Sequence, residues 1–143
     1  MLDKYIHGGH TIYDIKVHIV WVTKYRYPIL RKDIGYRIRG LLRQGCEARQ
    51  IGMLAGHIRP DHVHLLLSIP PILSISQVAK YLKGRSSHLM QDEFQELKKR
   101  YRGQRMWARG YFCVSLGEMT EDMITKYIEE QGKQDGDNFQ VAE

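Results

Sequence analysis

Two histidines separated by one residue, His62 and His64, are the residues of this chain whose types and spacing best suit chemistry. They lie in an apolar run that begins at Pro60 and ends at Pro70. Side chains two apart in a β-strand point to the same face, so these imidazoles would stand roughly 7 Å apart at their Cα atoms. Such a pair is half of a metal site, since imidazole is a common metal ligand. The alternative is a chance pair of histidines on a buried strand.

The best candidates for the rest of the site are Tyr127 and Gln131, which are four residues apart near the C-terminus. This spacing places both on one face of a helix. A phenol has a pKa near 10, so Tyr127 needs help to attack at neutral pH. A divalent ion held by the histidine pair would supply that help by polarising a phosphate oxygen. Considered alone, as one of nine tyrosines in the chain, Tyr127 is better explained as an amphipathic residue half-packed on the helix.

The charge of the chain is unevenly distributed, although the total is +6. From Glu118 onward there are 8 acidic and 2 basic residues, so the first 117 residues hold 20 of the 22 basic and 8 of the 16 acidic side chains, a net of +12. The segment 94–110 is especially basic. This balance favours a polyanionic partner, most simply nucleic acid, over an ordinary solvated surface.

The length and composition indicate one globular domain, which we place at residues 1–132, followed by a polar C-terminal tail at 133–143 that we expect to be flexible. No apolar run is long enough for a membrane span, and we expect no membrane partner. The N-terminus lacks the layout of a signal peptide. Cys46 and Cys113 form neither a disulfide framework nor a metal motif, and free thiols favour the cytoplasm.

The hydrophobic pattern predicts the elements that must position these residues. Ser74 and Gln77 form a capping-box pattern that opens one of the helices. We predict strands at 12–23, 51–58, 62–69 and 111–116, and helices at 33–49, from 74 to about 90, around 94–101 and from 120 onward. This order predicts an α+β protein with the ferredoxin-like split βαβ arrangement, in which an antiparallel sheet has helices on one face and a C-terminal helix carries the tyrosine.

The chain resembles the HUH-type single-tyrosine transposases of bacterial insertion sequences that transpose as single-stranded DNA. The resemblance covers about residues 13–131, and it depends on five blocks in order. These are Trp21-Val22-Thr23-Lys24-Tyr25-Arg26, Pro60-Asp61-His62-Val63-His64-Leu65-Leu66, Leu82-Lys83-Gly84-Arg85-Ser86-Ser87, Trp107-Ala108-Arg109-Gly110-Tyr111 and Tyr127-Ile128-Glu129-Glu130-Gln131.

The resemblance implies a role for each residue of the candidate site. His62, His64 and Gln131 would hold Mg²⁺ or Mn²⁺, and Tyr127 would be the nucleophile that forms a covalent 5′-phosphotyrosine and frees a 3′-hydroxyl. Imidazole also suits zinc or nickel, but the amide and phosphate oxygens favour a hard ion. Family members recognise hairpins at the ends of their elements and act as homodimers. In some of them the tyrosine helix completes the partner's site, and Gly117 would give that helix freedom here.

Basic residues elsewhere are candidates for the DNA-binding surface. Residues 24–27 interleave charge with aromatic rings, which suits unpaired bases stacking on a basic surface. The positions that we predict to contact nucleic acid are Lys24, Arg26, Lys83, Arg85, Lys98, Lys99, Arg100 and Arg105.

Three other residues, Asp61, His18 and His57, are weaker candidates for the site. Asp61 is either an acceptor for an imidazole N–H in the second shell of a metal site or simply a turn residue beside Arg59 and Pro60. We interpret His18 and His57 as packed or surface residues rather than ligands.

The sequence therefore favours a metal-dependent transposase that nicks and rejoins single-stranded DNA. A domesticated relative that processes genomic hairpins would keep the same chemistry. The alternative from a different class is a catalytically silent regulator that binds DNA or RNA hairpins. Retention of all four site residues speaks against lost catalysis, but it does not exclude an additional RNA-binding role.

Overall fold

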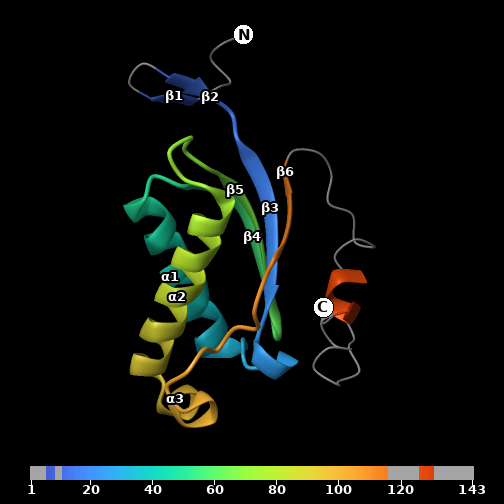
Figure 1. Cartoon of the computed structure of the whole chain (residues 1–143). Coiled ribbons are helices and arrows are strands. Elements are labelled where there is room, and N and C mark those ends of the chain that lie inside the picture. The colour runs from blue at the N-terminus through green and yellow to red at the C-terminus, as the bar shows by residue number, and fades with distance from the viewer. Residues whose placement is uncertain (1–5, 9–10, 116–125, 131–143) are drawn as a thin grey trace.

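The computed structural model describes residues 6–8, 11–115 and 126–130 of the chain (Figure 1). A four-stranded antiparallel sheet has the order β4-β5-β3-β6. Its strands, in chain order, are β3 (Lys16–Val22), β4 (Gly52–Arg59), β5 (His62–Ser68) and β6 (Phe112–Ser115). The first and third strands of this sheet, β3 and β5, occupy its centre, which is the strand order of the ferredoxin-like fold. The predicted fold is therefore confirmed.

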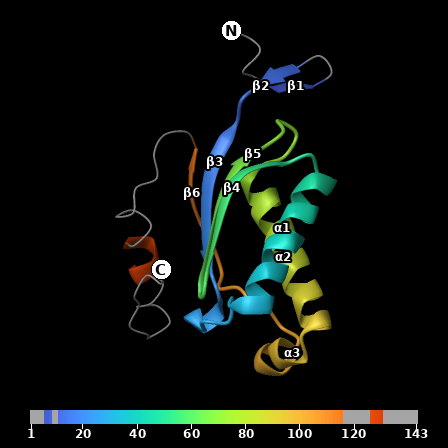
Figure 2. The same cartoon turned by 180° about the vertical axis from the view of Figure 1, so that it is seen from behind.

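Two long helices cover one face of this sheet, as Figures 1 and 2 show from opposite sides. They are α1 (Lys32–Ala48) and α2 (Ile75–Glu93), and the short helix α3 (Gln95–Tyr101) follows α2. The predicted capping box is present at the start of α2, where Ser74 Oγ accepts from the Gln77 backbone N–H and the Gln77 side chain accepts from the Ser74 N–H. These two bonds pair backbone donors that the first turn of a helix leaves without partners.

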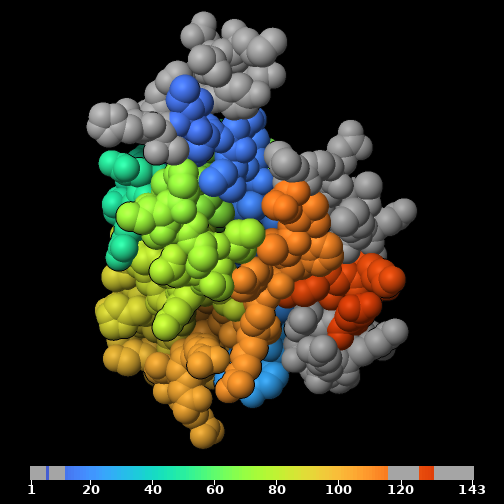
Figure 3. Space-filling model, turned by 45° about the horizontal axis from the view of Figure 1, so that its top comes forward, coloured from blue at the N-terminus to red at the C-terminus, as the bar shows by residue number. Residues whose placement is uncertain are grey.

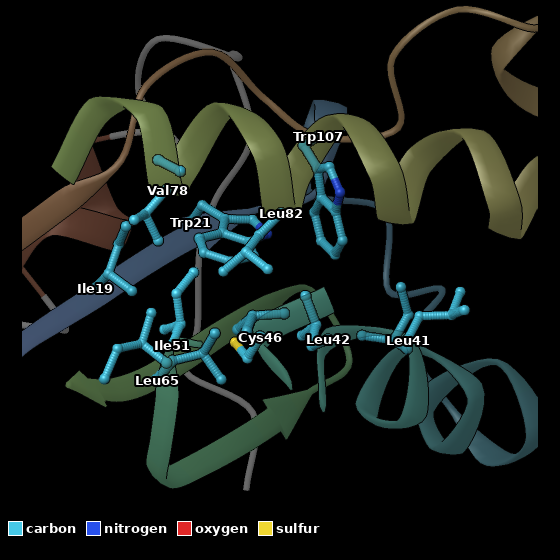
Figure 4. Packing of buried hydrophobic residues seen from close by; sticks show 14 of the residues in the cluster. Ile19, Trp21, Leu41, Leu42, Cys46, Ile51, Leu65, Val78, Leu82 and Trp107 are labelled. Atoms are coloured by element: carbon cyan, nitrogen blue, oxygen red, sulfur yellow. The ribbon is translucent and has the colours of Figure 1, made fainter. Parts of the chain in front are cut away.

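The main hydrophobic core fills the space between this face of the sheet and the helices, as the side chains in Figure 4 show. Alternate residues of the central strands point into it, including Ile19, Trp21 and Leu65, each no more than 1% exposed. Trp107 packs edge-on against Trp21, with ring centroids 5.8 Å apart. Burial of a large apolar side chain stabilises a fold by about 1.5–3 kcal/mol. The core thus fixes the strands whose other face carries the histidines.

The segment that leads into β6 is attached to α2 by polar contacts. Trp107 Nε1 donates to Ser86 Oγ over 2.9 Å, and the Met106 backbone N–H donates to Ser87 Oγ over 3.1 Å. The Lys83 ammonium donates to the Ala108 and Gly110 carbonyl oxygens at 2.8 and 2.7 Å. Two of the blocks that carry the resemblance, 82–87 and 107–111, are therefore joined to each other.

The N-terminal region differs from the predicted single strand at 12–23. Its residues divide between β2 (Thr11–Tyr13) and β3, with Asp14 and Ile15 between them. The strand β1 (Ile6–Gly8), which the sequence did not predict, pairs with β2 in a separate two-stranded sheet. Residues 24–26, predicted as a loop, form the short 3₁₀ helix η2 (Lys24–Arg26).

Two predictions concern residues that lie largely outside the described ranges. The final helix is described only at 126–130, so its predicted start at Thr120 is not covered, and neither is the proposed domain boundary at 132 or the tail. Within the described ranges, every helix is too short or too polar to cross a membrane.

Candidate active site and nucleic-acid surface

The histidine pair lies on the face of the sheet opposite to α1 and α2. In the antiparallel register, Val22 is directly opposite His62 and Val20 is directly opposite His64. Directly opposed residues share a face of the sheet, and Val20 and Val22 belong to a small cluster separate from the main core. The His62 side chain is buried and the His64 side chain is half-buried. The pleat of β5 therefore presents both imidazoles together, as the spacing predicted.

Asp61 contacts the first histidine of the pair. Its carboxylate Oδ1 lies 2.9 Å from His62 Nδ1, and both residues are buried. The backbone is fixed here as well, because the Thr23 N–H donates to the Asp61 carbonyl oxygen over 2.9 Å. A carboxylate at Nδ1 favours the tautomer in which Nε2 is free of a proton and able to accept a ligand bond. This contact agrees with the second-shell interpretation of Asp61, whose role stays a prediction.

Two further imidazoles lie beside His64, and the sequence interpretation did not assign them to the site. His18 Nδ1 is 3.2 Å from His64 Nε2, and the two ring centroids are 5.4 Å apart. The His57 ring centroid is 5.8 Å from that of His64, on the opposing residue of β4. The alternation of side chains along a strand places His18 on the same face of β3 as Val20. The register that brings this face beside His64 comes from the structure.

Burial, followed by the smaller effects of the neighbouring imidazoles of His18, His57 and His62, lowers the pKa of His64 to about 4. His64 is therefore neutral at physiological pH, which is the form that a metal ligand requires. Within the described residues, no group of three or more His, Cys, Asp or Glu residues is arranged to hold a metal ion. Any additional ligands must come from side-chain rearrangement, from substrate or from residues such as Gln131, which lies outside the described ranges.

Tyr127 lies on the histidine face of the sheet. Its ring packs edge-on against Phe112, with centroids 5.5 Å apart, and Phe112 is directly opposite Val20 on β3. Its neighbour Ile128 is fully buried against Val20 and Val22. Figure 3 shows the helical residues 126–130 in red beside the orange segment that includes β6. Tyr127 therefore contacts β6, and His64 lies on β5, on the other side of the central strand β3. Gly117, the predicted hinge before this helix, lies outside the described residues.

Three of the eight predicted DNA-contacting residues are engaged within the chain. Arg26 is only 7% exposed. Arg85 Nη1 donates to the Leu41 carbonyl oxygen of α1 over 2.8 Å. Lys83 makes the two carbonyl contacts described above, and burial, with a smaller effect of Arg105, lowers its pKa to about 8. In this structure Arg85 joins α2 to α1, and Lys83 joins α2 to the segment before β6.

The other predicted contacts lie mostly at the surface. Lys98, Lys99, Arg100 and Arg105 are exposed. The Arg100 guanidinium lies 4.7 Å from the centre of the Tyr27 ring, and the half-buried Lys24 lies 5.3 Å from that of Tyr25. A hollow of about 880 Å³ between α2 and the segment 103–111 combines rings with positive charge; its lining includes Trp107, Tyr111, Lys80, Lys83, Lys98, Arg105 and Arg109.

Comparison of the whole sequence with known proteins identifies the family that the sequence motifs resemble. Residues 11–131 match the family model described as "Transposase IS200 like". A transposase for insertion sequence element IS200 from Salmonella typhimurium is 36% identical over 127 residues, which cover 89% of this chain and 83% of the relative. The ISDra2 transposase TnpA of Deinococcus radiodurans is 32% identical over 124 residues, covering 87% and 89% of the two chains.

Solved structures agree with this fold. The crystal structure of a Deinococcus radiodurans protein described as a transposase superposes with a TM-score of 0.81 at 32% identity, covering 88% of this chain and 97% of that one. A REP-associated tyrosine transposase bound to a REP hairpin superposes with a TM-score of 0.54 at 16% identity, covering 92% and 71%. At that identity the second similarity concerns the fold alone.

Proposed function

Because the chain belongs to the IS200-like transposase family, we propose that it cleaves and rejoins single-stranded DNA at hairpin-marked element ends, with Tyr127 as the nucleophile. Transposase function follows from the family. The observation that carries the finer proposal is the common face of the sheet, on which His62, His64 and Tyr127 lie together although they come from β5 and from the last helical segment.

The donor set of this face fits a divalent metal ion. His64 is neutral at physiological pH because its pKa is lowered to about 4, and the contact of Asp61 with His62 Nδ1 favours the tautomer whose Nε2 carries no proton. We expect Gln131 to add an amide oxygen, which favours Mg²⁺ or Mn²⁺. When bound, the ion would polarise a non-bridging oxygen of the scissile phosphate.

Tyr127 would supply the attacking oxygen. Its phenolic oxygen forms a bond to phosphorus, and the bond from phosphorus to the 3′ oxygen breaks. The phenolic proton passes to solvent, and the departing 3′ oxygen takes up a proton to become a hydroxyl. The DNA then carries a 5′-phosphotyrosine linkage, and attack by another 3′-hydroxyl reverses the reaction to join new ends. Packing of the ring against Phe112 would limit the positions that the hydroxyl can reach.

The basic surface supports a DNA substrate. The hollow beside α2 places Trp107 and Tyr111 among several cations, and such interleaving suits unpaired bases as well as phosphates. The distant structural relative is bound to a REP hairpin, which is consistent with a hairpin substrate here. Exposed Lys99 and Arg100, which follow Lys98 of the hollow, extend the positive surface beyond it.

We further expect a homodimer. The strand β4 lies at the edge of the four-stranded sheet, and most of its residues are exposed. An edge strand presents unpaired backbone N–H and C=O groups that can pair with a second chain. Whether the tyrosine helix then serves its own sheet or that of the partner depends on residues 116–125, which lie outside the described ranges.

The decisive experiment is formation of a covalent protein–DNA adduct. Purified protein is incubated with labelled single-stranded DNA that carries an element end, with and without Mn²⁺, and resolved under denaturing conditions. We expect an adduct that requires the ion and is absent from Tyr127→Phe, which removes only the hydroxyl. Tyr36→Phe, a change at an exposed tyrosine of α1 outside the hollow, is the matched control and should retain the adduct.

Hairpin binding separates the two functional classes. If Tyr127→Phe binds the hairpin as tightly as the unmodified protein and only loses the adduct, the transposase mechanism is supported. If the unmodified protein binds the hairpin firmly but forms no adduct with either Mg²⁺ or Mn²⁺, the catalytic proposal fails and a binding regulator becomes the better description.

A further inference from the structure

We propose that Lys83 is a positioning residue for Tyr127, because its ammonium group holds the segment on which the tyrosine helix packs. The inference rests on the proposed function, since it concerns the placement of the proposed nucleophile. It gives an internal role to a cation that the charge pattern alone places among the DNA contacts.

The ammonium group of Lys83 is engaged by main-chain oxygens. Lys83 is a half-buried residue near the middle of α2. Its Nζ donates to the Ala108 carbonyl oxygen over 2.8 Å and to the Gly110 carbonyl oxygen over 2.7 Å. A lysine ammonium has three N–H donors, so most of its hydrogen-bonding capacity is directed at this segment. The surroundings disfavour the charge, since burial and, less strongly, Arg105 lower the pKa of Lys83 to about 8, and the two carbonyl dipoles compensate for part of that cost.

Ala108 connects the first of these hydrogen bonds to the tyrosine helix. Its backbone N–H donates to the Val22 carbonyl oxygen of β3 over 2.9 Å. Its side chain packs on the small cluster of three buried residues on the histidine face, Val20, Val22 and Ile128. Tyr127 packs on the same cluster. A displacement of Ala108 would therefore change the surface on which the tyrosine helix lies.

The preceding residue, Trp107, anchors the same segment on the other side of the sheet. It pairs with Thr23 in an antiparallel bridge, so its side chain and that of Ala108 point to opposite faces. The Trp107 ring is 2% exposed in the main core, and its Nε1 donates to Ser86 Oγ over 2.9 Å. Ser86 lies three residues after Lys83, on the same face of α2. The helix thus holds the segment through two neighbouring side chains.

The second carbonyl contact of Lys83 acts on the path into β6. Gly110 has a φ of +80°, a conformation that other residues rarely adopt. Two residues later Phe112 begins β6, and its ring packs edge-on against Tyr127 with the centroids 5.5 Å apart. Each of the two carbonyl groups that Lys83 holds therefore belongs to, or shortly precedes, a residue in contact with the tyrosine helix.

A direct contact between Lys83 and a DNA phosphate is the alternative, because Lys83 also lines the hollow beside α2. Lys80 is an exposed residue of the same helix and lines the same hollow, so it is the natural comparison. A lysine that neutralises a phosphate contributes about 0.7–0.9 to the slope of log affinity against log salt concentration. A positioning residue instead changes the rate of attack when the DNA is saturating, and it leaves that slope unchanged.

The first test measures position and requires neither DNA nor metal. Lys83→Met keeps an unbranched side chain but removes the N–H donors. In methyl spectra of the full chain we expect the signals of Ala108 and Ile128 to shift in this variant and to stay in place in Lys80→Met. Unshifted signals in a folded Lys83→Met protein overturn the inference, whether or not the chain cleaves DNA.

The second test separates the rate of adduct formation from DNA affinity. With saturating element-end DNA and Mn²⁺, we expect Lys83→Met to form the adduct about 10–100-fold more slowly, the size of effect that a small misplacement produces. Its hairpin affinity and salt slope should stay unchanged, whereas Lys80→Met should lower both. Lys83→Arg retains donors for the two carbonyl oxygens and should recover most of the rate. Lys16→Met, at a 45% exposed side chain that pairs with Asp14, is the matched control and should keep the rate and the affinity.

The outcomes distinguish this inference from the proposed function. If Lys83→Met weakens hairpin binding, reduces the salt slope and reacts at the normal rate once saturated, Lys83 is a DNA contact and the inference is overturned. If the unmodified protein forms no adduct, the proposed function fails, and the methyl signals alone decide whether Lys83 holds the segment beneath the tyrosine helix.

A second variant serves if circular dichroism shows that Lys83→Met does not fold. Ala108→Gly removes the methyl group that packs on the cluster but keeps the carbonyl oxygen that accepts from Lys83. It should slow adduct formation at saturating DNA without a loss of hairpin affinity. A normal rate in this variant would show that Ala108 does not place the tyrosine helix, and the inference would be overturned.

Discussion

The two faces of the four-stranded sheet are built from the same strands but differ in what their side chains contact. On the face toward α1 and α2, Ile19, Trp21 and Leu65 are almost completely buried in the main core. On the other face, His18 and His64 are only half-buried, and Tyr127 and Ile128 of the helical residues described at 126–130 pack on the small cluster around Val20. The alternation of a β-strand thus separates the side chains that stabilise the fold from those that we assign to chemistry.

The largest effect that we predict from this division is a difference in the free energy of unfolding between substitutions at two neighbouring leucines of β5. Leu65→Ala on the core face should lower the free energy of unfolding by about 2–5 kcal/mol, because it leaves a cavity among packed side chains. Leu66→Ala, on the histidine face and half-buried, should cost clearly less. Urea unfolding followed by circular dichroism measures both. Equal losses would show that the two faces contribute equally to stability.

On the histidine face, substitution of Asp61 should affect metal binding more than stability. Asp61→Asn keeps the size of the side chain but replaces the carboxylate that contacts His62 Nδ1. We expect Mn²⁺ affinity to fall by about 10–100-fold, as for other partners of metal-binding imidazoles, with little change in thermal stability. Isothermal titration calorimetry gives the affinity. A loss of stability without a loss of affinity would make Asp61 a turn residue only.

The low pKa of His64 predicts a dependence of stability on pH in the metal-free protein. The unfolded chain binds a proton at His64 near pH 6.5, but the folded chain does so only near pH 4. Unfolding therefore takes up a proton between these values, and the free energy of unfolding should decrease as pH falls from about 6.5 to 4.

The expected size of this effect is on the order of 1 kcal/mol between pH 6.5 and 5, because the ring is partly solvated. The control is His64→Asn, which should reduce the dependence of the free energy of unfolding on pH. Some dependence should remain, because other groups still titrate. Denaturant midpoints measured at several pH values give the slope. If the variant keeps the full dependence, the titration of His64 is not its cause.

The smallest effect is expected at the start of α2, the helix that lies on the face of the sheet opposite to the histidines. Ser74→Ala removes the acceptor for the Gln77 backbone N–H and should lower stability by about 1 kcal/mol. Metal affinity should not change, because the cap acts only on the helix that covers the core face. Ser76→Ala, on the exposed first turn of the same helix, should cost less and is the comparison. A change in Mn²⁺ affinity in Ser74→Ala would show that the two faces are coupled.

Local patterns were sufficient to predict most of the fold. The order of strands and helices along the chain follows from apolar periods of two and 3.6 residues. The same local patterns predict the common face of His62 and His64, and cap chemistry predicts the capping box at Ser74. The strand β1 was missed because Ile6–Gly8 is too short to show a period. The predicted strand at 12–23 was too long because the apolar pattern continues through the break at Asp14 and Ile15.

The contacts around the candidate site that the sequence did not reveal depend on pairing between distant segments. His18 and His64 are 46 residues apart, and only the β3–β5 register brings them within 3.2 Å. The same limit applies to cations. Arg85 looks like a surface charge in a helix, yet it donates to a carbonyl oxygen of α1, and Lys83 donates to two carbonyl oxygens before β6. A charge pattern alone does not tell a ligand contact from an internal one.

The strand order also has a consequence for synthesis of the chain on the ribosome. The central strand β3 is made before both of its neighbours, β5 and β6. At about 5–20 residues per second, His18 waits about 2–9 s for His64 to be added. Tyr127 is translated after all four strands of this sheet. A nascent chain can therefore assemble the imidazole face before it possesses the proposed nucleophile, so the proposed cleavage must wait until Tyr127 has been translated.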